Sequence, residues 1–301
     1  SDLHLKYKLN MTREQVLEAA VAEVEFAKAH GMKVTFVTED TFRADMDYVT
    51  QLYNACIDAG AGRVVLCDTI GIMTPSAITW YLGEIRKRFK PAQLSVHLHN
   101  DFGLAVANSL AALEAGVEVP HTCVNGIGER AGNASFEELV MALEAVYGYD
   151  TGIDVSRLYE VSRLVEHLSG IPVGVNKAIV GYNAFSHESG IHADGVIKHT
   201  GTYEPIQPEL IGRERRFIFG KHTGGTAVLD RLKKNGIEPT KEQLQEIVAA
   251  IKAVAESRRK EEQYAFIEAY RDREEKRRGV SDKEFWDIVR RVGLTPPPDF
   301  R

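Results

Sequence analysis

Two histidines, His97 and His99, stand two residues apart at the end of a short apolar run over residues 94–99. In a β-strand, side chains two positions apart point to the same face, so both imidazoles are expected on one side of a sheet. Two neighbouring imidazoles can bind one divalent metal ion when an oxygen ligand from elsewhere completes the site. Two hydrogen-bonded histidines on a sheet face would explain the same spacing. The pair is therefore a candidate metal site whose other ligands remain to be found.

Polar side chains also end the neighbouring apolar runs. Glu39-Asp40 follow residues 34–38, Asp68-Thr69 follow residues 64–67, Asn100-Asp101 follow residues 94–99, and Asn125-Gly126 follow residues 122–124. Such a collection of acids, amides and histidines exceeds what the packing of a core requires. It strengthens the interpretation of these strand ends as a site.

Residues 126–133, GIGERAGN, form a glycine-rich segment directly after the fourth run. Its glycines permit a tight backbone turn close to a ligand, and Arg130 could pair with an anion. Asn133 could offer its amide oxygen to a hard metal ion. A long loop between a strand and a helix would explain the segment equally well. His192, beside Asp194 in the irregular part of the chain, could act as a general base, although an ordinary surface histidine is the commoner case.

These residues lie on a repeating unit of one strand and one helix. The apolar runs recur roughly every 30 residues, the length of one βα unit. Thr12 with Gln15 and Ser135 with Glu138 predict capped helices between them, and Thr74-Pro75 predicts another helix start. Alternating strands and helices predict a parallel sheet covered by helices, and polar strand ends favour a (β/α)8 TIM barrel. An open doubly wound sheet is the alternative, but the glycine-rich segment does not open a first βα unit, as a dinucleotide fingerprint would.

The strand count predicts an incomplete barrel. Four strands are clear and a weaker fifth is expected at residues 151–153, whereas eight units need about 250 residues. Residues 1–8 are expected to be a loop that leads into the first helix. We therefore expect barrel strands 4–8 within residues 1–170, a linker and first subdomain over 171–236, and a helical second subdomain over 237–301. Strands 1–3 would come from a second polypeptide, or the sequence is a fragment.

Composition excludes several classes of protein. The chain of 301 residues has 37 Lys and Arg against 43 Asp and Glu, a net charge of −6, so a nucleic-acid partner is not expected. No apolar run approaches the roughly 20 residues that cross a bilayer, so we expect no membrane span. Three distant cysteines, Cys56, Cys67 and Cys123, predict no disulfide framework and are typical of a reducing cytoplasm.

Five strings occur in an order that resembles a known family. They are HLHNDFGLAVANSLAALEAG, NGIGERAGNAS, FSHESGIHADG, TYEPIQPELIG and GKHTGG. Together they resemble the 2-isopropylmalate, homocitrate and citramalate synthases, a group of the DRE-TIM metallolyases. The resemblance implies a TIM barrel that condenses acetyl-CoA with a 2-oxo acid and then hydrolyses the thioester. It also implies a divalent cation, Mg, Mn or Zn, as cofactor.

The resemblance also implies roles for single residues. Its metal ligands fall on His97, His99 and Asn133, and its carboxylate-binding threonine falls on Thr69. Glu39 and His192 match the pair that deprotonates the acetyl methyl group, Tyr203 matches a tyrosine beside them, and Arg43 is a candidate for a substrate carboxylate. In the family the segment with His192 and Tyr203 reaches into the neighbouring subunit's barrel, so a homodimer is implied.

One departure from the family pattern bears on activity. The Asp-Arg-Glu motif, which supplies one metal ligand and an arginine, follows none of the predicted strands. It would lie on the strands that the count lacks, so we expect no turnover without a partner chain, as in homocitrate synthases split into two subunits. A hydroxymethylglutaryl-CoA lyase-like enzyme and a non-catalytic or regulatory paralogue are the alternatives.

Overall fold

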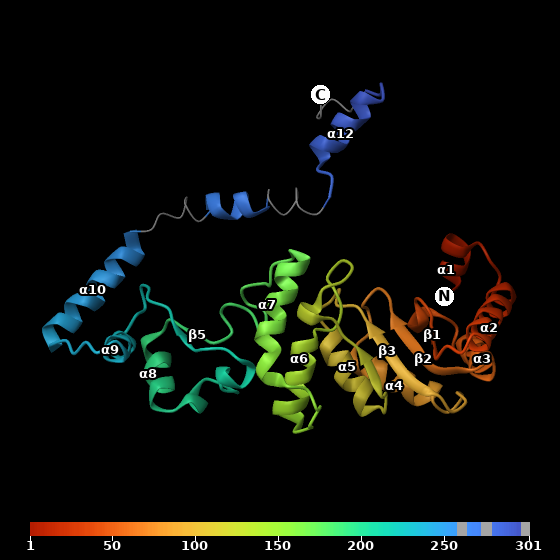
Figure 1. Ribbon diagram of the computed structural model, residues 1–301, viewed down its shortest axis with the longest axis horizontal. Helices are drawn as coiled ribbons and strands as arrows, with labels where there is room; N and C mark the ends of the chain where they lie inside the picture. Colours follow the sequence, from red (N-terminus) through yellow and green to blue (C-terminus); the bar gives the residue numbers. More distant parts are fainter. Residues whose placement is uncertain (258–263, 272–278, 296–301) are drawn as a thin grey trace. The chain divides into compact units, whose positions relative to one another are not determined.

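The computed structural model describes residues 1–257, 264–271 and 279–295 of the chain (Figure 1). It divides into two compact units. The first comprises Ser1–Ser186 and Glu204–Arg216, and the second comprises His187–Tyr203 and the described part of Phe217–Arg301. The functional boundaries expected at residues 170 and 236 stay predictions.

A parallel four-stranded sheet forms the centre of the first unit. Its strands are β1 (Val34–Val37), β2 (Ala61–Asp68), β3 (Gln93–Leu98) and β4 (Val119–His121), adjacent in chain order. Val64, Val65 and Leu66 of β2 are fully buried, as expected of a central strand covered on both faces. Because all four strands run the same way, their carboxyl ends share one edge of the sheet.

Helices before and between the strands cover this sheet (Figure 1). They are α2 (Arg13–Ala29), α3 (Met46–Asp58), α4 (Pro75–Ile85) and α5 (Ala105–Glu114). The main core contains Val64 and Leu66 of β2 together with Tyr53, Ile78 and Leu82, all completely buried. The predicted alternation of strand and helix is confirmed over these residues.

Most of the predicted helix signals are confirmed. Thr12 and Gln15 form a reciprocal capping box at the start of α2. The Thr74 side chain caps α4, with Pro75 in the first turn. Ser135 precedes α6 (Phe136–Met141) but makes no capping bond, because its hydroxyl instead accepts a hydrogen bond from Lys177.

Three local predictions are wrong. The fourth strand is Val119–His121 rather than residues 122–124, since Val124–Gly126 form a 3₁₀ turn whose Asn125 has a left-handed φ of 60°. Residues 151–153 form no strand, and the sheet has four strands within the described residues. Residues 1–8 are not a loop: Asp2–His4 are α-helical (α1) and Leu5–Leu9 form a π-helix.

The remaining elements extend both units. In the first, α6 and α7 (Leu158–Ser169) contribute to a smaller core around Val140, Phe185 and Ile211. The second contains α8 (Gly190–Lys198), α9 (Gly225–Lys234), α10 (Lys241–Ser257) and α12 (Asp282–Arg291). β5 (Ser186–His187) pairs with β6 (Arg216–Phe217). The described elements within residues 237–301 are helices, and a helical subdomain over this whole range stays a prediction. None of the described helices is both long and apolar enough to cross a membrane.

Candidate active site

The carboxyl ends of β1, β2 and β3 are joined by hydrogen bonds into one rim. After β1, the Asp40 amide donates to Thr69 Oγ1 at 2.7 Å. At the end of β2, the Asp68 carbonyl accepts a hydrogen bond from the His99 amide at 3.2 Å. Residues after β4 join the same rim, since the Asn100 amide donates to the Gly132 carbonyl at 2.9 Å. The tertiary structure thus brings together the polar strand ends that the sequence singled out.

The histidine pair has the predicted geometry. The rings of His97 and His99 lie with centroids 5.2 Å apart, and both side chains are half-buried. Asn133 Nδ2 lies 3.1 Å from His97 Nε2, and Asn133 forms a backbone bridge with His99. Burial lowers the pKa of both histidines, so their neutral, ligand-competent form is favoured. The three predicted ligands are therefore neighbours.

These side chains fit a divalent metal ion. His99 Nδ1 is buried without a hydrogen-bond partner, as a nitrogen meant for another ligand would be. Two imidazoles and an amide oxygen are donors that Zn²⁺ and Mn²⁺ accept. Among the described residues, no group of three or more His, Cys, Asp or Glu side chains could hold a metal ion. The set therefore depends on Asn133 and requires further oxygen ligands.

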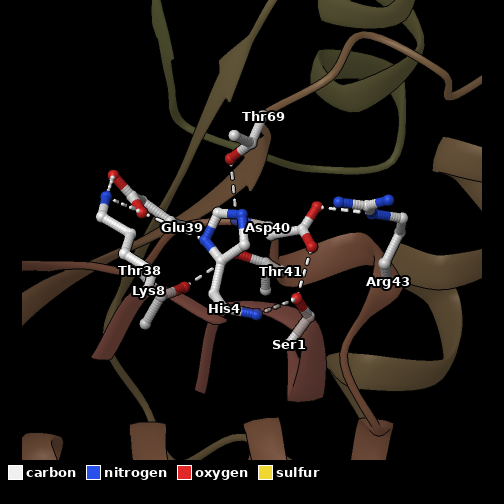
Figure 2. A network of polar contacts seen from close by, with 9 residues as sticks. All are labelled: Ser1, His4, Lys8, Thr38, Glu39, Asp40, Thr41, Arg43 and Thr69. Carbon is white, nitrogen blue, oxygen red and sulfur yellow. Dashed lines mark hydrogen bonds and ion pairs between the residues drawn. The ribbon is translucent and has the colours of Figure 1, made fainter. Parts of the chain in front are cut away.

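Glu39 and Asp40 leave the end of β1 in different directions (Figure 2). The Glu39 carboxylate is 54% exposed, and both of its oxygens lie near Lys8 Nζ, at 2.7 and 2.5 Å. The hydrogen bond from Lys8 holds the pKa of Glu39 below its usual range. Asp40 is only 2% exposed and has a left-handed φ of 57°, which turns the chain sharply between the two acids.

Thr69 and Arg43, the predicted substrate-binding residues, both contact Asp40. Thr69 Oγ1 accepts the Asp40 amide hydrogen, so its own hydroxyl hydrogen can donate to a carboxylate. Arg43 Nε donates to Asp40 Oδ1 at 2.7 Å. Burial would raise the pKa of Asp40, but the bonds from Arg43 and Ser1 outweigh it and lower that pKa. Arg43 is thus partly engaged within the chain, with its side chain about one-third exposed.

A buried chain of hydroxyl groups supports the turn after β1. The Cys67 amide donates to Thr41 Oγ1 at 2.9 Å, and Thr41 Oγ1 lies 2.7 Å from Thr38 Oγ1. Thr38 Oγ1 lies 2.6 Å from the Tyr53 hydroxyl, which donates to the Val65 carbonyl at 2.6 Å. Since the first bond begins at an amide and the last ends at a carbonyl, every hydroxyl in between both accepts and donates. This series of hydroxyl groups links β2 to the turn after β1, where β1 no longer pairs with β2.

Arg130 does not have the free guanidinium that an anion site would need. Its Nε and Nη2 donate to the two Asp101 oxygens at 2.7 and 2.9 Å, and Nη2 also donates to the Thr69 carbonyl at 2.7 Å. The bidentate pair lowers the pKa of Asp101. Arg130 therefore ties the glycine-rich loop to the ends of β2 and β3.

His192 and Tyr203 lie in the second compact unit, whereas the other predicted site residues lie in the first. Their rings lie with centroids 4.2 Å apart and are tilted by 33°. Gly195 of α8 leaves room for this arrangement, because a Cβ there would lie 2.7 Å from the Tyr203 ring. The structure therefore pairs these two residues with each other.

Several residues of the rim were not predicted from the sequence. His121 lies beside His97 with ring centroids 5.5 Å apart. It was missed because the fourth strand was placed three residues too late. His4 and Lys8 contact Glu39 from the first helical segment, which was expected to be a loop. No local signal in the sequence marks this contact, since the partners are 35 and 31 residues apart.

Comparisons with known proteins agree with this architecture. Residues 1–165 match the HMGL-like family, and residues 179–259 match the homocitrate synthase post-HMGL domain-like family. A probable 2-isopropylmalate synthase of Methanopyrus kandleri is 52% identical over 85% of the chain and 51% of its own length. A homocitrate synthase of the same organism is 48% identical over 86% of the chain and 65% of its own length. An (R)-citramalate synthase of Methanocaldococcus jannaschii is 50% identical over 84% of the chain and 51% of its own length. The chain thus spans about half to two-thirds of these relatives.

Solved structures with a similar fold include two lyases. The HMG-CoA lyase of Bacillus subtilis has a TM-score of 0.53 and 23% identity, covering 58% of this chain and 63% of that one. An HMG-CoA lyase of Acinetobacter baumannii, in complex with coenzyme A and 3-methylmalate, has a TM-score of 0.51 and 26% identity, covering 56% and 59%. These similarities confirm that the fold is of the TIM-barrel type predicted from the sequence. The chain belongs to the HMGL-like family, and its predicted kinship with the 2-isopropylmalate, homocitrate and citramalate synthases is confirmed.

Proposed function

We propose that this chain carries part of the catalytic domain of an acyltransferase that condenses acetyl-CoA with a 2-oxo acid. The product would be a 2-hydroxy di- or tricarboxylate such as 2-isopropylmalate, homocitrate or citramalate. One observation supports this above the others: synthases of all three kinds are 48–52% identical over 84–86% of the chain. Identity to the lyases of similar fold is only 23–26%, which favours a synthase over a lyase.

Each predicted residue has a role in this reaction. His97, His99 and Asn133 would hold a divalent cation, Mg, Mn or Zn, which when bound polarises the carbonyl of the 2-oxo acid. Thr69 would donate its hydroxyl hydrogen to the substrate carboxylate, and the exposed end of Arg43 would face the same carboxylate. Glu39 would accept a proton from the acetyl methyl group, so that the resulting carbon nucleophile attacks the polarised carbonyl.

The assembly is also part of the proposal. His192 and Tyr203, as a paired unit, would complete the deprotonation site in the barrel of a neighbouring subunit, which requires a homodimer. Barrel strands 1–3 and the remaining metal ligand would come from outside these residues, on a second polypeptide or on a longer form of this chain. The free thiols of Cys56, Cys67 and Cys123 are consistent with a reducing cytoplasm as the compartment. The retained rim argues against a non-catalytic paralogue.

Release of free CoA thiol from acetyl-CoA tests this function. The assay uses 2-oxoisovalerate, 2-oxoglutarate and pyruvate in turn, with added metal, and with or without a polypeptide that carries strands 1–3. We expect one of the three oxo acids to support thiol release, and only when that polypeptide is present. Full turnover by these residues alone would contradict the need for strands 1–3, and no turnover under any condition would contradict the synthase.

A further inference from the structure

The first helical segment, residues 1–9, presents one polar face to the end of β1. Ser1, His4 and Lys8 are three and four residues apart, a spacing that aligns side chains along one side of a helix. The π-helix over Leu5–Leu9 follows α1 without a break, so His4 and Lys8 stay on that side. Figure 2 shows these three side chains directed toward the two acids that follow β1.

The contacts converge on adjacent carboxylates. Lys8 Nζ donates to both Glu39 oxygens at 2.7 and 2.5 Å, and His4 Nδ1 lies 3.1 Å from Glu39 Oε2. Ser1 Oγ donates to Asp40, whose other oxygen is bonded to Arg43. The sequence around β1 therefore supplies the acids, and the segment over residues 1–9 supplies their partners.

We propose that Lys8 and His4 are positioning residues for the Glu39 carboxylate, so that residues 1–9 form a wall of the active site. This inference rests on the proposed role of Glu39. A half-exposed glutamate beyond the end of a strand has several rotamers open to it, and a general base must be aimed at its proton. Exposed ion pairs contribute little to stability, so orientation of Glu39 is the effect expected from these contacts.

The hydrogen-bond count identifies the reactive oxygen. A carboxylate oxygen can accept two hydrogen bonds, so Glu39 has four acceptor positions. With the hydrogen of His4 on Nδ1, Lys8 and His4 fill both positions on Oε2, whereas Lys8 fills one on Oε1. Oε1 therefore keeps one lone pair free, and it is the atom expected to take the proton.

Charges around Glu39 set the direction of a pH test. Lys8 and His4 face it from residues 1–9, the buried Cys67 thiol faces it from β2, and Asp40 with its partner Arg43 follows it in the chain. Lys8 has the largest effect and lowers the pKa of Glu39. Removing that charge is expected to raise the pKa toward the ordinary value for glutamate.

Variants at Lys8 test the inference. In Lys8→Met, the pKa of Glu39, followed by carboxyl ¹³C NMR on the chain itself, should rise, and kcat should fall about tenfold or more. The KM for the oxo acid should stay unchanged, and the acid limb of the kcat profile should move to higher pH. Lys8→Arg should restore the pKa of Glu39 and kcat, because it keeps a cationic donor. Lys6→Met is the matched control, since Lys6 lies on the same helical segment but over the Tyr7 ring, whereas the ion pairs of Glu39 are with Lys8 and His4.

A second pair of variants isolates His4. His4→Ala should lower kcat, and His4→Asn should recover it, because the asparagine amide can donate from nearly the position of Nδ1. An unchanged Glu39 pKa in Lys8→Met, or an equal loss of kcat in Lys6→Met, would overturn the inference. Absence of thiol release from the wild type under every condition would instead refute the proposed synthase, while the NMR titration would still report the Lys8 contact separately.

Discussion

At the scale of single residues, the turn after β1 depends on buried polar groups. Asp40 adopts a left-handed conformation that non-glycine residues rarely adopt, and it is held by Arg43 and by the Thr69 hydroxyl. Thr41 also supports this turn, because its hydroxyl accepts a hydrogen bond from the Cys67 amide of β2. The position of Glu39 is therefore set partly by Thr41, which has no role in the proposed reaction, and partly by Thr69 and Arg43, which are also proposed to bind the substrate carboxylate.

Replacing Thr41 by valine tests this support. The change keeps the shape of the side chain but leaves the buried Cys67 amide without its acceptor, so the free energy of unfolding should fall by about 1–3 kcal/mol. Hydrogen exchange at the Cys67 amide should become faster, whereas Thr41→Ser should stay close to wild type. Urea unfolding and exchange measured by NMR check both expectations; equal stability of the valine and serine variants would contradict the role of the hydroxyl.

At the scale of elements, the parallel sheet and the loop after β4 assemble the candidate metal ligands. β3 places His97 and His99 on one face, and the glycine-rich loop returns Asn133 to them. Gly132 has a φ of 85°, and a Cβ there would lie 1.9 Å from the Gly126 carbonyl oxygen. The loop can close only because this position lacks a side chain.

Gly128→Ala should weaken metal binding through this loop. A Cβ at this position would lie 2.1 Å from Asn133 Oδ1, so the amide must move away. We expect the affinity for Zn²⁺ or Mn²⁺, measured by titration calorimetry, to fall by about 10–100-fold, as when a ligand loses its orientation. Gly83→Ala on α4 is the matched control, because a Cβ there meets nothing within 4 Å. The same affinity in both variants would argue against Asn133 as a ligand.

At the scale of the whole molecule, the predicted site residues belong to two compact units. Glu39 and Thr69 lie in the unit built on the parallel sheet, whereas His192 and Tyr203 lie in the other. In the proposed homodimer, each active site would combine the first unit of one chain with His192 of the other. The activity of mixed dimers would therefore reveal whether two chains share each active site.

Mixing two inactive chains should restore activity. In a dimer of Glu39→Gln with His192→Ala, one site would receive intact Glu39 and intact His192, while the other would lack both. Random mixing makes half of the dimers mixed, so about one-quarter of wild-type thiol release is expected under conditions in which wild type is active. Recovery far below that level would place both residues of a site on the same chain.

Local patterns allowed much of the sheet and its polar edge to be predicted. Val64, Val65 and Leu66 are a short apolar run that only a buried strand explains well, and the capping residues Thr12 and Thr74 mark helix starts. Residues 122–124 were misassigned because Thr122 and Val124 are β-branched and have the right propensity, whereas pairing with β3 engages Val119–His121 instead. Propensity is local, and strand register depends on the neighbouring strand.

The sequence by itself determined the alternating strands and helices, the common face of His97 and His99, and the collection of polar groups at strand ends. These depend on spacings of a few residues, which backbone geometry converts directly into direction. Only the tertiary structure decided that Lys8 and His4 reach Glu39, that Arg130 binds Asp101, and that His121 joins the histidine pair. Those contacts join residues distant in the chain. Parallel strands bring Asp101, Arg130 and the histidines to one edge of the sheet, whereas Lys8 and His4 reach that edge from a helical segment.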